Sequence, residues 1–184
     1  MNRQRSNIIG VVIAACAAAL LMLPSTAFAQ GDYESSGQIG QGKNVGIGLG
    51  GGSIVSGLTL KGYFSDKLAG QLFLGGAGAW GYGGFGFGID GDIVYEFATI
   101  AEADGVGRLF LGAGGGAGFI ANPFFSAGSV NALFEMGWHF TEVPIELVID
   151  YRPTFYFGGF NTLRFAGPGG FIPWGFSGAF RFYF

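Results

Sequence analysis

Cysteine and histidine, two residue types that often carry catalysis and metal binding, are almost absent from this chain. It contains one cysteine, Cys16, and one histidine, His139. Metal sites usually combine several cysteine, histidine and carboxylate ligands, and a general base must lie within hydrogen-bond reach of its nucleophile. His139 is followed by Phe140 and Thr141 rather than by a nearby serine. We therefore predict that the chain is not an enzyme and has no catalytic residues, no cofactor and no metal site.

Charged residues are also scarce. They make up 11% of the chain, whereas about 25% is usual in soluble domains. A soluble protein needs charged side chains on its surface to remain dispersed, so this composition argues against an ordinary soluble domain. The formal net charge is −3, and this acidic balance argues against a nucleic-acid partner, which would require a basic patch.

The N-terminal residues have the features of a secretory signal peptide. Arg3 and Arg5 form a basic start, residues 8–23 form an apolar stretch, and an A-x-A cleavage site ends at Ala29. The apolar stretch is short for a membrane anchor and ends at Pro24. We predict cleavage after Ala29.

A lipoprotein signal is the alternative, because residues 13–16 resemble a lipobox that ends at Cys16. That cleavage would leave residues 17–23 as an unfavourable apolar start of the mature chain. Cleavage after Ala29 removes Cys16, and the remaining chain has no disulfide and no thiol chemistry. Its length suits one domain.

Glycine and aromatic residues are abundant instead. Glycine accounts for 38 of the 184 residues, about three times the ~7% that is usual, and aromatic residues account for 17%. The segment 174–184 shows how they are arranged. Phe176, Phe180, Phe182 and Phe184 share one face, and a serine, an arginine and a tyrosine share the other. This period of two is that of a β-strand.

Eight segments alternate in this way between apolar residues and polar or small residues. They cover residues 43–51, 55–64, 68–76, 84–97, 108–118, 129–140, 145–157 and 174–184. Compact turns at 65–67 and 141–144 alternate with longer loops at 122–127 and 158–173. Short turns on one side and longer loops on the other predict an all-β fold, an eight-stranded antiparallel up-and-down barrel.

Three stretches depart from the regular pattern. Pro153 lies within the seventh segment and cannot donate to a closed ladder, so we expect a bulge or a strand end there. Residues 98–107 are long for a turn. Residues 72–89 carry no charge and could be read as a membrane-spanning helix. Their eight glycines would each cost a helix about 1 kcal/mol relative to alanine, so we reject that reading.

The charged residues of these segments share the polar faces. If the apolar faces point outward, a charge network lies in the barrel lumen, formed by Lys61, Asp90, Asp92, Glu96, Arg108, Glu135, His139, Glu146, Asp150, Arg152 and Arg181. A soluble barrel would bury the aromatic faces instead. An eight-stranded barrel is only wide enough for side chains to fill, and its outside would then be lined with glycine. The pattern therefore favours a transmembrane β-barrel with its apolar faces in lipid.

Buried charges are costly when isolated, so we expect these residues to pair or to be hydrated. Most of them fall in the middle of the barrel and on its turn side. The glycines of the first, fourth and fifth segments fall nearer the loop side. This distribution predicts a charged plug below a roomier, glycine-lined cup.

The C-terminal sequence F-S-G-A-F-R-F-Y-F resembles the terminal signature of Gram-negative outer-membrane barrels. In that class the last strand is read by the barrel-assembly machinery, which implies an assembly signal at Phe180, Phe182 and Phe184. The chain from Lys43 onward resembles the small eight-stranded class, which includes the membrane domain of OmpA, OmpX and the opacity-like proteins. The resemblance implies a monomer in the cell outer membrane, with outer-membrane lipid and the assembly machinery as partners.

These observations divide the chain into a signal peptide at 1–29, a flexible N-terminal segment at 30–42 and an outer-membrane β-barrel at 43–184. The expected role is structural or surface-interacting, with a lumen occluded by charged residues. A narrow pore, a small-ligand-binding barrel and a lipid A-modifying enzyme are the alternatives.

Aromatic residues also occur in or beside the predicted loops: Trp80, Tyr82, Phe124, Phe125, Phe160 and Trp174. They fit an interfacial girdle or a surface that contacts an extracellular ligand.

Overall fold

A computed structural model describes residues 45–52, 55–78, 85–121, 126–140, 142–158 and 170–184. They form the strands β1 (Val45–Gly52), β2 (Val55–Tyr63), β3 (Leu68–Gly78), β4 (Phe85–Ala103), β5 (Gly107–Ala121), β6 (Ser126–Phe140), β7 (Ile145–Tyr151), β8 (Thr154–Gly158), β9 (Phe171–Ile172) and β10 (Phe176–Tyr183). The predicted signal peptide and N-terminal segment lie outside the described residues. Within the described part of the chain, no helix is long and apolar enough to cross a membrane.

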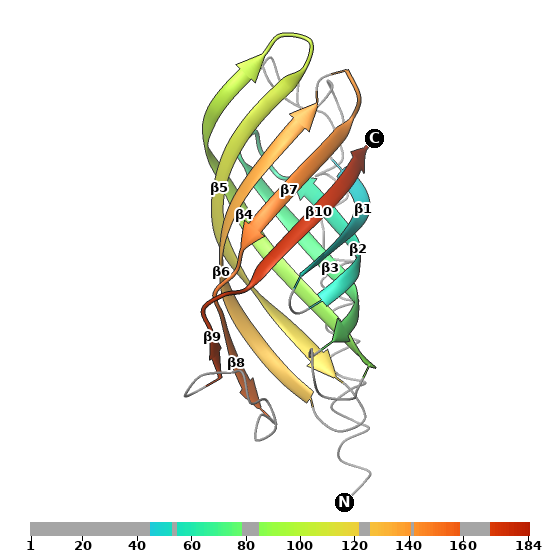
Figure 1. Ribbon diagram of the computed structural model, residues 1–184, viewed down its shortest axis with the longest axis vertical. Coiled ribbons are helices and arrows are strands. Elements are labelled where there is room, and N and C mark those ends of the chain that lie inside the picture. Colours follow the sequence, from blue (N-terminus) through green and yellow to red (C-terminus); the bar gives the residue numbers. More distant parts are fainter. Residues whose placement is uncertain (1–44, 53–54, 79–84, 122–125, 141, 159–169) are drawn as a thin grey trace, which may run out of the picture. The chain divides into compact units, whose positions relative to one another are not determined.

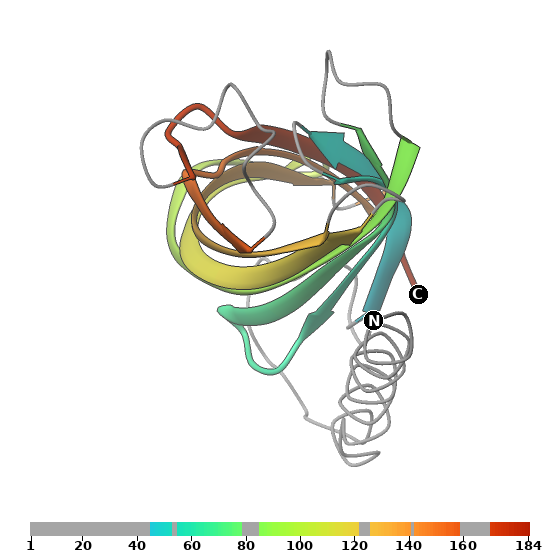
Figure 2. The same ribbon diagram turned by 90° about the horizontal axis from the view of Figure 1, so that it is seen from below.

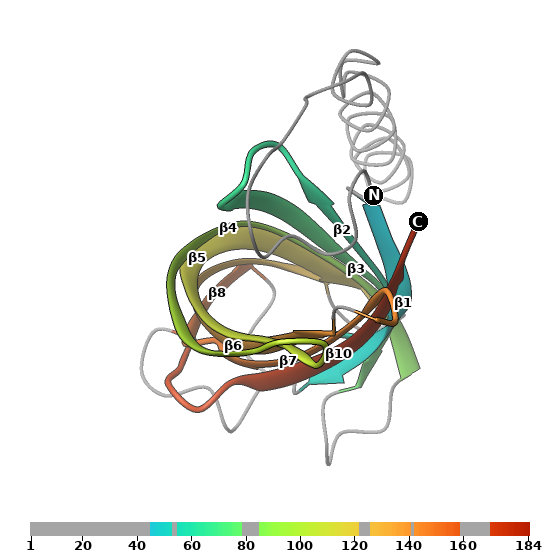
Figure 3. The same cartoon turned by 90° about the horizontal axis from the view of Figure 1, so that it is seen from above.

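The strands close into a barrel (Figure 1, Figure 2, Figure 3). All paired strands are antiparallel, and the order β5-β4-β3-β2-β1-β10-β7-β6 is closed by pairing of β5 with β6. β8 takes over beside β6 where β7 ends, and β9 pairs with β8 as β10 pairs with β7. The strands therefore occupy eight positions around a ring, and the predicted eight-stranded antiparallel up-and-down barrel is confirmed. β6 and β9 begin inside the loops predicted at 122–127 and 158–173, so those loops are shorter than expected.

The predicted strand end at Pro153 is confirmed, since β7 stops before this residue and β8 starts directly after it. Proline has no N–H to donate, but the Pro153 carbonyl accepts a hydrogen bond from the Ala132 N–H at 3.1 Å. The Arg152 N–H donates to the Gly175 carbonyl at 2.7 Å. The chain thus stays bonded to both neighbouring strands through the break.

The prediction of a long turn at residues 98–107, between the fourth and fifth segments, is wrong. β4 and β5 continue into it and end in a short hairpin turn, where the Val106 N–H donates to the Ala103 carbonyl at 3.0 Å and Gly105 adopts a φ of 74°. Two register shifts in β4, the first between Glu96 and Ala98, break the period of two, so the sequence pattern fades there. The β4–β5 hairpin extends beyond the other strands at this end of the barrel (Figure 1).

Side chains alternate between the outside and the inside of the barrel. On β10, Phe180 and Phe182 are 48% and 47% exposed, whereas Arg181 and Tyr183 are 0% exposed. Apolar side chains cover the outer faces of the other strands, among them Leu49, Phe87, Ile93, Tyr95, Phe134, Ile149 and Phe155. Buried residues fill the interior, including Phe73, Phe110, Leu133, Val148 and Tyr156. The core of this protein therefore lies inside the barrel.

The predicted roomy, glycine-lined cup is wrong for inward glycines of β1 and β5, because side chains of other strands fill the space beside them. A Cβ on Gly50 would lie 2.8 Å from the ring of Phe73, and a Cβ on Gly118 would lie 2.7 Å from the Asp90 carboxylate. The ring of Tyr183 occupies the space that a Cβ on Gly46 would need. These inward glycines make room for larger side chains of other strands, and the interior is filled there.

Candidate functional site

The residues predicted to form the lumen network all face the barrel interior. Those that are 0–6% exposed are Lys61, Asp90, Asp92, Glu96, Glu135, His139, Glu146, Asp150, Arg152 and Arg181. The Arg108 side chain is 16% exposed and bonds to Glu96 at 2.8 Å. The contacts divide them into two layers, because Glu146 and Asp150 lie on the same face of β7 but four residues apart along it.

The first layer is built around an ammonium group. We call it the Lys61 layer, and it contains Lys61, Glu96, Arg108, Glu135, His139, Glu146 and Arg181. Lys61 Nζ donates to Glu135 at 2.7 Å and to Glu96 and Glu146 at 3.2 Å each. β2 and β6 lie opposite each other in the ring, so the ion pair of Lys61 with Glu135 crosses the barrel.

Arg181 is held through its whole guanidinium group. Its Nη1 pairs with Glu146 at 2.5 Å, its Nη2 donates to the Gln71 side-chain oxygen at 2.8 Å, and its Nε donates to the Thr59 hydroxyl at 3.0 Å. The acidic partner of this terminal-strand arginine is therefore on β7, the neighbour of β10. Because all three guanidinium nitrogens of this buried arginine make hydrogen bonds, its side chain is held in one orientation.

His139 lies between an aromatic ring and polar groups. Its imidazole stacks on Phe110 with the ring centroids 4.3 Å apart, and its Nε2 lies 3.1 Å from the Tyr63 hydroxyl. Tyr63 donates to Glu96. His139 also approaches Glu96 and Glu146 at 3.4 Å and 3.3 Å.

Glu96, His139 and Glu146 have ligand atoms that all lie within 4.8 Å of one another. Such a group could hold a metal ion. Lys61 Nζ, however, lies 3.2 Å from both Glu96 Oε1 and Glu146 Oε2. The lysine ammonium thus compensates the two carboxylates that a metal ion would use.

The second layer is built around a guanidinium group. We call it the Arg152 layer, and it contains Arg152, Asp90, Asp92, Asp150 and Asn131. Arg152 Nη1 lies 2.7 Å from both Asp90 and Asp92, and Nη2 lies 3.1 Å from Asp150. Asn131 donates to Asp90 at 3.1 Å. Because β7 and β4 lie three positions apart in the ring, Arg152 also ties distant walls together.

Gln71 and Phe73 connect the two layers. Gln71 accepts from Arg181 at 2.8 Å and donates to Asp92 at 3.3 Å. The Phe73 ring centroid lies 4.6 Å from Arg152 Cζ and 5.6 Å from Arg181 Cζ. The charged interior is therefore one connected network.

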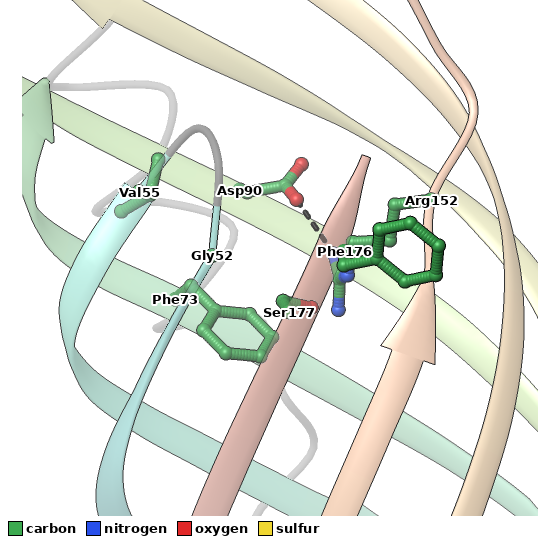
Figure 4. A pocket seen from close by; sticks show the side chains of 7 residues that line it. All are labelled: Gly52, Val55, Phe73, Asp90, Arg152, Phe176 and Ser177. Atoms are coloured by element: carbon green, nitrogen blue, oxygen red, sulfur yellow. Dashed lines mark hydrogen bonds and ion pairs between the residues drawn. The ribbon is translucent and has the colours of Figure 1, made fainter. Parts of the chain in front are cut away.

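A small recess reaches the Arg152 layer. Its volume is about 20 Å³, and it is lined by Gly52, Val55, Phe73, Asp90, Arg152, Phe176 and Ser177 (Figure 4). This is room for roughly one water molecule.

Several members of the network were not singled out from the sequence. Each of the following hydrogen-bonds a charged member: Tyr63, Gln71, Asn131, Ser177 and Tyr183. Four of them share the inward parity of a charged residue on their own strand, so the period of two could have identified Tyr63, Asn131, Ser177 and Tyr183. β3 carries no charged residue, so Gln71 had no such marker. Their neutral side chains gave no further reason to select them.

The residues of the predicted assembly signal lie on the outside. Phe180, Phe182 and Phe184 are 47–59% exposed. Trp174 is 63% exposed. The other aromatic residues that the sequence placed in loops lie outside the described residues.

With this geometry established, the chain was compared with known proteins. No protein-family model, no curated protein and no solved structure matches it.

Proposed function

We propose that this chain is an integral outer-membrane β-barrel with a structural or surface-interacting role and an interior closed by its charge network. The observation that carries the proposal is the inversion of polarity between the two sides of the wall. Glu146, Asp150 and Arg181 are 0% exposed inside the barrel, whereas Leu49 and Ile149 are 69% and 61% exposed outside. Soluble monomers rarely expose apolar surface of such extent, and a lipid bilayer would cover it.

The strand lengths support the same proposal. β1, β2 and β10 contain 8, 9 and 8 residues. At ~3.3 Å per residue and a tilt of ~40°, they rise roughly 20–23 Å, close to the ~25 Å apolar band of such barrels. β4, β5 and β6 contain 19, 15 and 15 residues, enough to extend beyond the band.

We also propose a non-enzymatic role. His139 is 2% exposed, and its ring nitrogens face Tyr63, Glu96 and Glu146. A general base must reach the proton that it removes from a substrate, and this imidazole is enclosed by side chains that already neutralise one another. The arrangement supports a brace between strands rather than a lipid A-modifying centre.

Membrane extraction followed by gel electrophoresis tests the proposal. The protein should sediment with outer membranes, require detergent for release, and migrate differently when it is left unboiled, because a folded barrel resists the denaturing detergent. The boiled sample is the control. Recovery in the soluble fraction with no change in mobility would overturn the proposal.

A further inference from the structure

The ring closes at one seam, where the first strand β1 pairs with the last strand β10 (Figure 1). The inward positions of β1 are all glycine: Gly46, Gly48, Gly50 and Gly52. Their partners on β10 are, in the same order, Tyr183, Arg181, Ala179 and Ser177. β1 therefore places no side chain in the lumen, and the interior contacts of the seam depend on the residues of β10.

The half of the seam nearer the turns, residues 46–48 with 181–183, is held together across β1. Arg181 Nε donates to the Thr59 hydroxyl on β2 at 3.0 Å, and Nη2 donates to Gln71 on β3 at 2.8 Å. The Tyr183 ring lies 6.1 Å from the ring of Tyr63 on β2, measured between centroids. Arg181 and Tyr183 therefore connect β10 to β2 and β3 without side chains of β1.

The half nearer the loops lacks such contacts. Its paired residues are small on both strands: Gly50 with Ala179, Gly51 with Gly178 and Gly52 with Ser177. Ser177 donates to Asp150 of β7 at 2.9 Å, on its own side of the seam. Among the described residues, no side-chain hydrogen bond joins this half of β10 to β2 or β3. The Phe73 ring covers Gly50, and beyond it the backbone ladder is the main attachment.

The small recess lies at this loop half of the seam. Gly52, Phe176 and Ser177 line it from the two seam strands, and Asp90 and Arg152 line it from inside the barrel (Figure 4). Phe176 is 58% exposed on the outer face, whereas Asp90 and Arg152 are 6% and 4% exposed. The recess thus leads toward the charged interior at the part of the seam that side chains hold least.

We propose that the seam opens laterally from its loop end, and that Arg181 and Tyr183 form a latch that stops the opening halfway along β1. Segments with few buried contacts open locally at a lower free-energy cost. The proposal goes beyond the proposed function and rests on it in one respect. At the loop end of these short strands, interfacial water can hydrogen-bond the released backbone groups, which hydrocarbon cannot do. Opening would connect the Arg152 layer with the membrane interface.

Hydrogen exchange of the folded protein in detergent tests the direction of opening. The chain enters β1 and leaves β10 at the turn end, so ordinary fraying of these strands would begin there. The latch predicts the opposite gradient. Amide groups at 50–52 and 177–179 should exchange at least tenfold faster than those at 46–48 and 181–183. Equal protection of the two halves, or faster exchange at the turn end, would overturn the proposal.

A disulfide across the seam provides a matched test. Leu49 and Phe180 are directly opposite and face outward, so cysteines at both positions lie at a separation that a disulfide can span. The oxidised form of Leu49→Cys with Phe180→Cys should slow exchange at 50–52 and 177–179 at least tenfold relative to its reduced form. Leu58→Cys with Leu74→Cys, a directly opposite pair on β2 and β3, is the control. An equal effect of the two bridges on the seam would contradict lateral opening.

Arg181→Lys tests the latch itself. Lysine keeps the positive charge but cannot reproduce the planar set of donors that reaches β2 and β3. Exchange at 46–48 should rise at least tenfold. Arg108→Lys, on β5 and away from the seam, should leave it unchanged. Unaltered exchange at 46–48 in Arg181→Lys would show that Arg181 is not a latch. All three measurements use detergent-folded protein, so they are independent of the mobility experiment, which tests membrane location.

Discussion

Glycines that face the barrel interior leave the space in which the buried charged side chains lie. Asp92 is paired with Gly116 across β4 and β5, and Asp90 with Gly118. The aspartate oxygens occupy the space that side chains at these glycines would need. At the level of single residues, the glycine content of the chain is therefore a packing requirement of the charge network as well as a feature of composition.

Gly118→Ala should destabilise the barrel. The new Cβ would lie 2.7 Å from Asp90 Oδ1, 2.8 Å from Ser129 Oγ and 2.9 Å from a backbone oxygen, and overpacking of this kind costs about 1–3 kcal/mol. Gly91→Ala is the matched control, because its Cβ would meet no atom closer than 3.7 Å. Urea unfolding of the two variants measures the difference, and equal midpoints would contradict the packing argument.

Lys61→Met should cost about 3–5 kcal/mol, because it leaves buried carboxylates without their cation. Adding Glu135→Gln should recover part of that loss, since the closest carboxylate, at 2.7 Å, is neutralised at the same time. Lys67→Met, at an exposed turn position, controls for removal of a lysine. The free energies of unfolding of the parent, of Lys61→Met and Glu135→Gln alone, and of the double variant measure the coupling. Loss of stability that is simply additive would show that the pair does not act as a unit.

At the level of strands, two neighbouring positions of the ring are interrupted together. β7 ends at Tyr151, directly before Arg152, and β8 begins at Thr154. β9 gives way to β10 beside this break, where Gly175 accepts from the Arg152 N–H. A Cβ on Gly175 would overlap the Arg152 carbonyl. The break thus lies at the residue whose side chain crosses the lumen, and it is matched by a glycine on the adjacent strand.

The outer face of β10 supports a prediction about assembly. If the chain is the outer-membrane barrel proposed above, Phe184→Ala should reduce the amount of folded protein in that membrane, because the resemblance of the C-terminal sequence implies that its last aromatic residue is read during assembly. Refolding of the purified variant in detergent should change little, since Phe184 is 59% exposed. Phe176→Ala, at the other end of the same face and 58% exposed, is the control. Equal cellular levels of the two variants would argue against the signal.

At the level of the whole molecule, the charged interior acts as a set of cross-braces. Lys61 with Glu135 joins opposite walls, and Arg152 with Asp90 and Asp92 joins walls three positions apart. Gln71 connects the two braces. The closed ring and its filled interior therefore stabilise each other.

This architecture predicts that the reconstituted protein conducts ions poorly. In planar bilayers it should show no steady, large conductance, because side chains of the two layers occupy the lumen. Arg152→Ser, which removes the largest cross-lumen side chain of its layer, should increase brief openings. A large, stable conductance of the unmodified protein would favour the pore alternative instead.

The sequence predicts which face of its strand a residue occupies, but it does not predict which residue pairs with it across the barrel. The inward positions of Lys61, Glu146 and Arg181 follow from the alternation of residues on their own strands. The ion pair of Lys61 with Glu135 does not follow, because these residues are 74 positions apart and meet only when the ring closes. The long turn after β4 was predicted wrongly because register shifts hide a strand whose pairing with β5 is seen only in three dimensions.

The sequence by itself determined the eight strand positions around the ring and which side chains face inward, because a period of two is a local property of an extended chain. Only the tertiary structure decided that the inward glycines accommodate rings and aspartates rather than line a cup. It also decided that one layer is neutral and the other carries excess negative charge. The physical reason is that charge balance and packing depend on which strands face each other across the lumen, and this is set by the register and closure of the whole sheet.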